Sequence, residues 1–208
     1  MSVQLTLIRH GPTEWNATRR FQGRSDVPLS VRGRAHAQAI AAALAADPID
    51  RIYSSDLSRA LETARILSAA RGIEVESDPR LREFDFGKWE GLTWDEIVTA
   101  YPHLTGLGST AAKRYAPEGG ESFEEVRERL RSFLDEIVRA DPAANVAVVT
   151  HAGPLHAIVS ILQLAEADSP PDRLSLNFTP GGISRIAMEE GRARIITLND
   201  TGHLNTAG

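Results

Sequence analysis

The sequence predicts an α/β fold of three layers, in which a mostly parallel sheet has helices on both faces and an antiparallel edge. Two observations lead to this prediction. Segments typical of strands alternate with segments typical of helices as far as residue 164. After them, strand-like segments at 183–188 and 194–198 flank a turn around 190–192, which is the pattern of a hairpin at the edge of a sheet.

The first half of the chain shows the alternation most clearly. Residues 3–8 are apolar and β-branched, and a Gly-Pro pair soon follows, so a strand is predicted to end in a loop. The segment 30–46 begins with a serine that can cap a helix and is rich in Ala, which favours helix. A strand at 49–54, a helix at 56–72 that a Gly ends, and a strand at 73–76 complete this half.

Two helix starts are marked in the middle of the chain. Thr93 and Ser122 are each followed three residues later by Glu, which is the spacing of a capping box. This spacing predicts helices at 94–101 and 123–140. Between them, residues 103–120 are rich in Gly, Thr, Ser and Pro, which is typical of an irregular surface segment and makes the segment a candidate lid.

The last part of the chain returns to the alternating pattern. A continuous apolar strand is predicted at 145–150, an apolar helix at 154–164 and a further strand at 174–178. No repeat or low-complexity linker divides the sequence, and a chain of this length can bury one substantial core. We therefore expect a single domain over 1–208, with 84–120 as an insertion or lid that sets substrate specificity.

The composition excludes several classes of protein. The chain has no Cys, so disulfide scaffolds, thiolate zinc sites and thiol nucleophiles are ruled out. A net charge of −5 at pH 7 argues against binding nucleic acid through a broad positive field. The apolar run near the start stops at Arg9, too early for a signal or membrane segment. We expect a cytoplasmic protein that binds neither nucleic acid nor membrane.

Polar residues follow three of the predicted strands. His10, a pair of serines and His151 come directly after, or at the ends of, the strands at 3–8, 49–54 and 145–150. Because ligands bind at the carboxyl ends of the strands in open α/β sheets, these groups are expected to converge. Arg9 adjoins the first of them, and Arg59 lies in the first turn of the next helix. Two imidazoles and two guanidinium groups favour an anion, and a phosphoryl group matches the forked donors of Arg.

Competing motifs are poor. The sequence has no Gly-x-Gly-x-x-Gly, and the pair Gly87-Lys88 has Arg82 where a phosphate-binding loop needs its first Gly. No His-Glu-x-x-His occurs, and His151 and His156 are five residues apart, which does not suit two metal ligands on one helical face. We expect no metal ion and no cofactor.

Residues 7–16 read Leu-Ile-Arg-His-Gly-Pro-Thr-Glu-Trp-Asn, and they resemble the signature of the histidine phosphatase superfamily, the phosphoglycerate mutase-like enzymes. Further segments resemble those of the family in the same order. They are Phe21-Gln22-Gly23, residues 53–64 around Arg59, residues 82–87 around Glu83, and residues 148–153 around His151. The resemblance covers roughly residues 3–165 and implies a phosphoglycerate mutase-like version of the predicted fold.

The resemblance implies that His10 is the nucleophile, which takes a phosphoryl group to give a phosphohistidine that water later hydrolyses. A neutral imidazole is an available nucleophile, and a backbone carbonyl near Gly11 is expected to hold its other nitrogen. Arg9, Arg59 and His151 would surround the transferred group and neutralise its charge, as phosphoryl transfer requires.

The resemblance also implies a set of substrate-binding residues and a proton donor. The binding residues are Asn16, Gln22, Gly23 and the backbone of Ala152. The family pattern assigns proton donation to the leaving oxygen to Glu83. Chemistry alone does not separate Glu83 from Asp85, because both are carboxylates on one face of an extended segment.

Structural alternatives stand beside these roles. Arg59 is three residues from Asp56 and from Glu62 on the same predicted helix, so its alternative is a surface ion pair. For Glu83 the alternative is a solvated carboxylate or a salt bridge to a neighbouring arginine, and for the Gln-Gly pair at 22–23 it is an ordinary turn. We expect His36 to lie at the surface.

Three features favour hydrolysis over phosphoryl transfer to a second hydroxyl. The acid segment resembles the phosphatase branch, Asp85 stands where mutases of the family have His, and the segment 103–120 is short, with Lys113 and Arg114 where mutases have a longer basic insertion. We therefore expect a metal-independent phosphomonoester hydrolase that acts on a small phosphorylated metabolite. The pattern is similar to alpha-ribazole phosphatase and to broad-specificity phosphatases. A cofactor-dependent phosphoglycerate mutase and a non-catalytic binder of phosphorylated ligands are the alternatives, and the chain is expected to be a monomer or homodimer.

Overall fold

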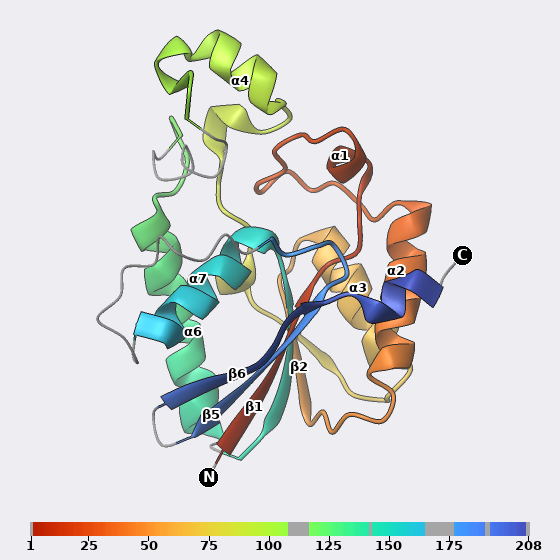
Figure 1. Ribbon diagram of the computed structural model, residues 1–208. Helices are drawn as coiled ribbons and strands as arrows, with labels where there is room; N and C mark the ends of the chain where they lie inside the picture. The colour runs from red at the N-terminus through yellow and green to blue at the C-terminus, as the bar shows by residue number, and fades with distance from the viewer. Residues whose placement is uncertain (1, 108–116, 142, 165–176, 190–191, 207–208) are drawn as a thin grey trace.

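The computed structural model describes residues 2–107, 117–141, 143–164, 177–189 and 192–206 (Figure 1). The strands are β1 (Ser2–Arg9), β2 (Arg51–Ser54), β3 (Val75–Ser77), β4 (Asn145–Thr150), β5 (Ile183–Glu189) and β6 (Arg192–Asp200). The helices are α1 (Glu14–Ala17), α2 (Val31–Ala43), α3 (Ser58–Ala69), α4 (Trp94–Ala100), α6 (Phe123–Ala140) and α7 (Ala152–Leu164), with short 3₁₀ turns at Pro79–Leu81, Gly87–Trp89, Pro102–Leu104 and Gly202–Thr206.

The strands form one sheet in the order β3-β2-β4-β1-β5-β6. β3, β2, β4 and β1 are parallel, whereas β5 pairs antiparallel with β1 and with β6. The predicted mostly parallel sheet with an antiparallel edge is thus confirmed. In the register of β1 and β4, Arg9 lies opposite Thr150, so the residue that follows each strand leaves the sheet at the same level.

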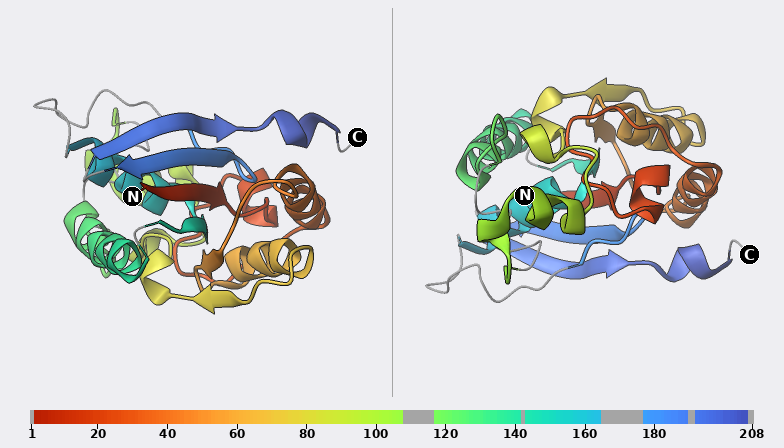
Figure 2. Two further views of the ribbon diagram at one scale, coloured as in Figure 1. Left: turned by 90° about the horizontal axis from the view of Figure 1, so that it is seen from below. Right: turned by 90° about the horizontal axis from the view of Figure 1, so that it is seen from above.

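Helices cover both faces of the sheet, as predicted (Figure 2). Successive residues of a buried strand face opposite sides, and β1 shows this directly. Leu5 and Leu7 belong to the apolar cluster under α6 and α7, whereas Ile8 belongs to the cluster under α2 and α3. Because both faces are apolar, the central strands are continuous hydrophobic runs, which is why the sequence identified them well.

Most predicted elements are present, and the differences concern their ends. α2 stops at Ala43 rather than at 46, and α3 begins at Ser58 because Leu57 is still extended. Both predicted capping boxes close, at the starts of α4 and α6. Of the strand predicted at 174–178, residues 174–176 lie outside the described residues. The prediction is wrong for 177–178, which belong to no strand.

The expectation that His36 lies at the surface is wrong. It is 8% exposed, and its Nδ1 lies 3.2 Å from Pro180 O. The chain returns at 180–182 across the start of α2 and covers this histidine, a contact between segments far apart in the sequence. Within the residues that the structure describes, no helix is long and apolar enough to cross a bilayer.

The carboxyl ends of the parallel strands point to the end of the molecule where α1 and α4 lie (Figure 1). Loops from widely separated parts of the chain gather there. Any site built on the ends of β1, β2 and β4 is therefore walled by the segments around α1 and between β3 and α4.

Candidate active site

His10 follows the last residue of β1 and continues the sheet ladder, with its N–H donating to Thr150 O at 3.0 Å. Its Nδ1 lies 2.6 Å from Gly11 O. A carbonyl oxygen only accepts, so Nδ1 carries the proton and Nε2 keeps its lone pair. Burial, and then the charges of Arg59 and Arg9, lower the pKa of His10 well below its usual 6.5. At neutral pH the imidazole is neutral, with an available nitrogen.

His151 follows β4 in the same way, and its ring lies beside that of His10, with 5.0 Å between ring centroids. Its Nε2 is 2.8 Å from Ser55 Oγ, which also accepts from Leu57 N–H. When the Ser55 hydroxyl donates to Nε2, the proton of His151 is on Nδ1, a buried atom that has no partner within the part of the chain that the structure describes. Burial, and then the charge of Arg59, lower the pKa of His151 well below 6.5.

Arg59 extends from the first turn of α3 and is fully buried. Its guanidinium donates to Gly23 O at 2.7 Å and to Ser25 O at 2.9 Å. The surface ion pair considered from the sequence does not form, because Asp56 pairs with Arg82 and Glu62 pairs with Arg34. Burial lowers the pKa of Arg59, yet no carboxylate of the described residues neutralises its charge in an ion pair.

Arg9 is the second cation of the site. Its guanidinium donates to Phe178 O, and its Nε is buried and has no partner among the described residues. Removal from water lowers the pKa of Arg9 to about 10, so the side chain is still charged at pH 7. Two cations removed from water and held by neutral carbonyl groups are unfavourable unless an anion joins them, so this arrangement is a binding site for an anion.

Glu83 lies opposite these cations and is 9% exposed. Its Oε1 accepts from Gly153 N at 3.1 Å and from Phe84 N at 3.0 Å. The alternative salt bridge to a neighbouring arginine is absent, because Arg80 pairs with Asp78 and Glu136 and Arg82 pairs with Asp56. A Cβ on Gly153 would lie 2.3 Å from Oε1, so only glycine lets α7 approach this carboxyl group so closely.

The structure separates the two carboxylates that the sequence left open. Asp85 points elsewhere: its Oδ1 accepts from Gly87 N at 2.9 Å and its Oδ2 is 3.3 Å from Arg24. It does not line the cavity that contains Glu83. The geometry thus favours Glu83 as the carboxyl group next to a bound anion.

The histidine, arginine and glutamate side chains described above lie around a cavity of about 190 Å³ at the carboxyl ends of the strands. Eight of the nine residues that the sequence proposed line it, and they are Arg9, His10, Asn16, Gln22, Gly23, Arg59, Glu83 and Ala152. The ninth, His151, packs against His10. The sequence did not assign the remaining lining residues, which are Trp15, Arg19, Arg20, Phe21 and Phe86.

The four expected substrate-binding residues differ in the polar groups that they present. Asn16 accepts from Thr13 N through Oδ1 at 2.9 Å, which leaves its amide NH₂ as a donor. Gln22 is buried, and no described residue provides a hydrogen-bond partner for its Oε1. Gly23 has a φ of +56° and gives its carbonyl to Arg59, so the pair at 22–23 does more than turn the chain. Ala152 begins α7, where the first N–H groups have no intrahelical acceptor.

Residues 5–201 match the family described as the Histidine phosphatase superfamily (branch 1). The chain belongs to this superfamily. The match spans both strand-end histidines and the acid segment, so the family resemblance seen in the sequence is confirmed.

Two proteins and one solved structure are similar to this histidine phosphatase over most of its length. Phosphoserine phosphatase 1 of Hydrogenobacter thermophilus is 34% identical over 97% of this chain and 94% of its own length. Glucosyl-3-phosphoglycerate phosphatase of Mycolicibacterium vanbaalenii is 38% identical over 81% of this chain and 77% of its own. A solved structure from Escherichia coli, described as a candidate alpha-ribazole-5'-P phosphatase, has a TM-score of 0.83 and 27% identity, covering 95% of this chain and 96% of that one. The protein is an enzyme, a phosphatase of this superfamily.

Glu90 makes contacts beside the cavity that the sequence did not reveal. Its Oε1 accepts from Arg24 N at 2.7 Å and from Phe86 N at 3.2 Å, and its Oε2 accepts from Ser25 N at 2.8 Å and Ser25 Oγ at 2.6 Å. The loop that it holds is the one whose carbonyls bind Arg59. No local pattern indicates this role, because two of the backbone donors lie 66 and 65 residues away.

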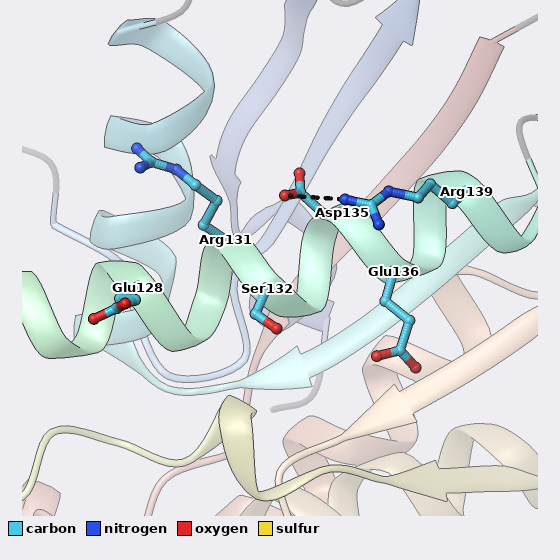
Figure 3. A pocket seen from close by; sticks show the side chains of 6 residues that line it. All are labelled: Glu128, Arg131, Ser132, Asp135, Glu136 and Arg139. Carbon is cyan, nitrogen blue, oxygen red and sulfur yellow. Dashed lines mark ion pairs between the residues drawn. The ribbon is translucent and has the colours of Figure 1, made fainter.

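A larger hollow lies far from this chemistry, on the outer face of α6 (Figure 3). Its volume is about 480 Å³, and its lining residues are Glu128, Arg131, Ser132, Asp135, Glu136 and Arg139. All six come from one helix, and Asp135 pairs with Arg139 at 3.7 Å. Volume does not identify a site here, because a single exposed helical face brings no convergent, buried groups to a ligand.

Proposed function

We propose that this phosphatase is a metal-independent phosphomonoester hydrolase that acts on a small phosphorylated metabolite through a phosphohistidine intermediate on His10. One observation carries the proposal. The free Nε2 of a neutral, buried imidazole lies in a cavity with two guanidinium groups that have no ion-pair partner among the described residues. Such a site combines a nucleophile with charge stabilisation for a transferred phosphoryl group.

The first step forms the intermediate. The lone pair of His10 Nε2 attacks phosphorus, and the bond from phosphorus to the ester oxygen breaks. Glu83 gives its proton to that oxygen, so the alcohol leaves neutral, and Nε2 holds the phosphoryl group. General acid catalysis of this kind typically contributes about 10²–10⁴-fold.

The second step restores the enzyme. Glu83, now ionised, takes a proton from water as the water oxygen attacks phosphorus. The N–P bond breaks, its electron pair returns to Nε2, and inorganic phosphate leaves. Acid and base are the same carboxyl group, and its close approach to Gly153 N–H fixes its position in both steps.

The remaining groups hold the charge of the phosphoryl oxygens. Arg9 and Arg59 supply positive charge, and His151 supplies an N–H from the ring beside the nucleophile. The amide groups of Asn16 and Gln22 and the main chain at Gly23 and Ala152 complete the cradle. Because these donors are in place before the substrate binds, little reorganisation is needed.

Hydrolysis is favoured over mutase activity by the acid segment and by relatives that are named as phosphatases. Asp85, held by Arg24, stands where mutases of the family have His. We infer that the chain is a single domain in which residues 84–120 shape substrate specificity. We also infer that the protein is cytoplasmic and is a monomer or a homodimer. Its partner would be a small phosphate ester rather than nucleic acid or a membrane.

The deciding experiment is phosphate release from a panel of phosphomonoesters in the presence of EDTA, with His10→Ala as the test variant. His103→Ala, at an exposed histidine, is the matched control. We expect turnover that EDTA does not affect and that only His10→Ala abolishes, together with an acid-labile phosphoenzyme after a rapid quench. Strict metal dependence, or full activity of His10→Ala, would overturn the mechanism. Isomerisation of phosphoglycerate without phosphate release would favour the mutase, and binding without turnover would favour the non-catalytic alternative.

A further inference from the structure

The cavity has a buried inner end and an open outer end. Arg59 and His10, at the inner end, are 0% and 2% exposed. Arg19 also lines the cavity, but its side chain is exposed, so it lies where the cavity meets solvent. A ligand whose phosphate reaches the inner arginines can therefore extend toward Arg19.

The guanidinium of Arg19 differs from that of Arg20 in its contacts. The guanidinium of Arg20 donates to Gly91 O at 2.5 Å and pairs with Glu96 at 2.9 Å. Within the described ranges, the guanidinium of Arg19 makes no hydrogen bond and no ion pair. A cation beside a ligand cavity that no protein group neutralises is available to the ligand.

The backbone at Arg19 makes this choice of residue notable. Its φ is +55°, in the left-handed region that favours glycine. The conformation follows from the chain's exit from α1, where Arg19 N donates to Asn16 O and Arg20 N donates to Trp15 O. Glycine would adopt this turn at a lower conformational cost, so the backbone conformation does not explain why an arginine is present at this position.

The balance of charges along the cavity also indicates that the charge of Arg19 is available to a ligand. Four arginines and one glutamate line it, and Glu96 neutralises Arg20 from outside. A phosphomonoester dianion matches Arg9 and Arg59. The charge of Arg19 then still lacks a counterpart. Trp15, Phe21 and Phe86 also line the cavity, so part of the ligand need not be polar.

We propose that Arg19 binds a second anionic group on the substrate, so that the preferred substrates are short phosphomonoesters with a carboxylate or a second phosphate at the end remote from the scissile bond. The proposal rests on the proposed function for the location of the first phosphate. Arg19 is thus a specificity residue, which acts on binding and leaves the chemical step unchanged.

Binding of phosphonates tests the proposal without relying on turnover. Propylphosphonate and 2-carboxyethylphosphonate differ only in a carboxylate that replaces a methyl group, and propane-1,3-bisphosphonate supplies a second phosphorus anion. By calorimetry we expect the two doubly anionic compounds to bind about tenfold more tightly than propylphosphonate, as one charge-assisted contact predicts. In Arg19→Gly, which suits the backbone, this preference should vanish. In Arg131→Gly, on the outer face of α6, it should persist.

Hydrolysis provides the second measurement. On 3-phosphooxypropanoate, Arg19→Gly should raise KM about tenfold and leave kcat within about twofold, and on propyl phosphate both should stay unchanged. Equal affinities in the native protein, or equal effects of Arg19→Gly on singly and doubly anionic compounds, would overturn the proposal. Loss of the proposed function has a different signature, because hydrolysis of propyl phosphate would then continue in His10→Ala. A preference for only one of the two second anions identifies which group Arg19 binds.

Discussion

The inner end and the outer wall of the active-site cavity are built differently. The inner end comes from residues that follow β1 and β4, from the first turn of α3 and from Glu83, and its side chains are held by main-chain groups or by the hydroxyl of Ser55. The wall comes from the loops at 15–23 and from the segment that follows Glu83, and much of it is exposed or half-buried. On the proposed mechanism, this difference means that the sheet positions the phosphoryl chemistry, whereas the loops select the molecule that carries the phosphate.

The largest effect should come from Glu83→Gln, at the inner end. Gln cannot donate a proton to the leaving oxygen, so kcat/KM for alkyl phosphates should fall by about 10²–10⁴-fold. For p-nitrophenyl phosphate, whose leaving group needs little protonation, the loss should be much smaller. A series of leaving groups of graded pKa measures the difference. A uniform loss across the series would move proton donation away from Glu83.

The two strand-end histidines should make stability depend on pH. Their pKa values are lowered in the folded state, so below pH 6.5 the unfolded chain binds protons that the folded chain does not. Stability should therefore fall with decreasing pH, by about 1.4 kcal/mol per pH unit for each histidine. Urea denaturation from pH 7 to pH 5.5 measures the slope. His10→Asn should halve this contribution and His103→Asn should leave it unchanged, whereas an unaltered slope in His10→Asn would contradict the expectation.

Glu90 joins the two regions, and Glu90→Gln should have the smallest of these effects. The new NH₂ group faces backbone N–H donors, so the loop at 23–25 loosens and Arg59 loses its fixed carbonyl partners. We expect kcat/KM to fall about tenfold, the cost of roughly one misplaced charge-assisted contact. Affinity for inorganic phosphate should fall in parallel, which a purely global loss of stability would not produce in protein that is still folded. Glu124→Gln, at an exposed carboxylate of α6, is the control.

The sequence predicted the inner end better than the wall, for a physical reason. Strands buried on both faces are continuous apolar runs, so the places where they end, at His10 and His151, can be found from the sequence. Residue chemistry did not decide whether Glu83 or Asp85 is the proton donor, because both side chains are carboxylates and only their surroundings separate them. The partners of Arg59 were not predictable either, since local acidic neighbours suggest ion pairs and the structure uses carbonyls more than thirty residues away.

The sequence-based predictions that were wrong or incomplete concern residues whose environment depends on contacts between distant segments. His36 is buried because the chain at 180–182 returns over it, and no property of its own helix indicates this. Phe178 was expected in a strand, but its carbonyl instead accepts a hydrogen bond from Arg9. Arg19 escaped notice because exposed arginines are common, and only the cavity and the backbone angle distinguish it from the others.

The pairing of β1 with β4 has a consequence for how such an enzyme can diversify. Arg9 lies opposite Thr150, so the two histidines leave adjacent strands side by side, and their 5.0 Å separation is close to the roughly 4.8 Å spacing of neighbouring strands. A slip of one residue would turn one ring to the other face of the sheet. The distance between the two histidines is therefore fixed by the main-chain ladder, so the sequence of the surrounding loops can change without disturbing that distance.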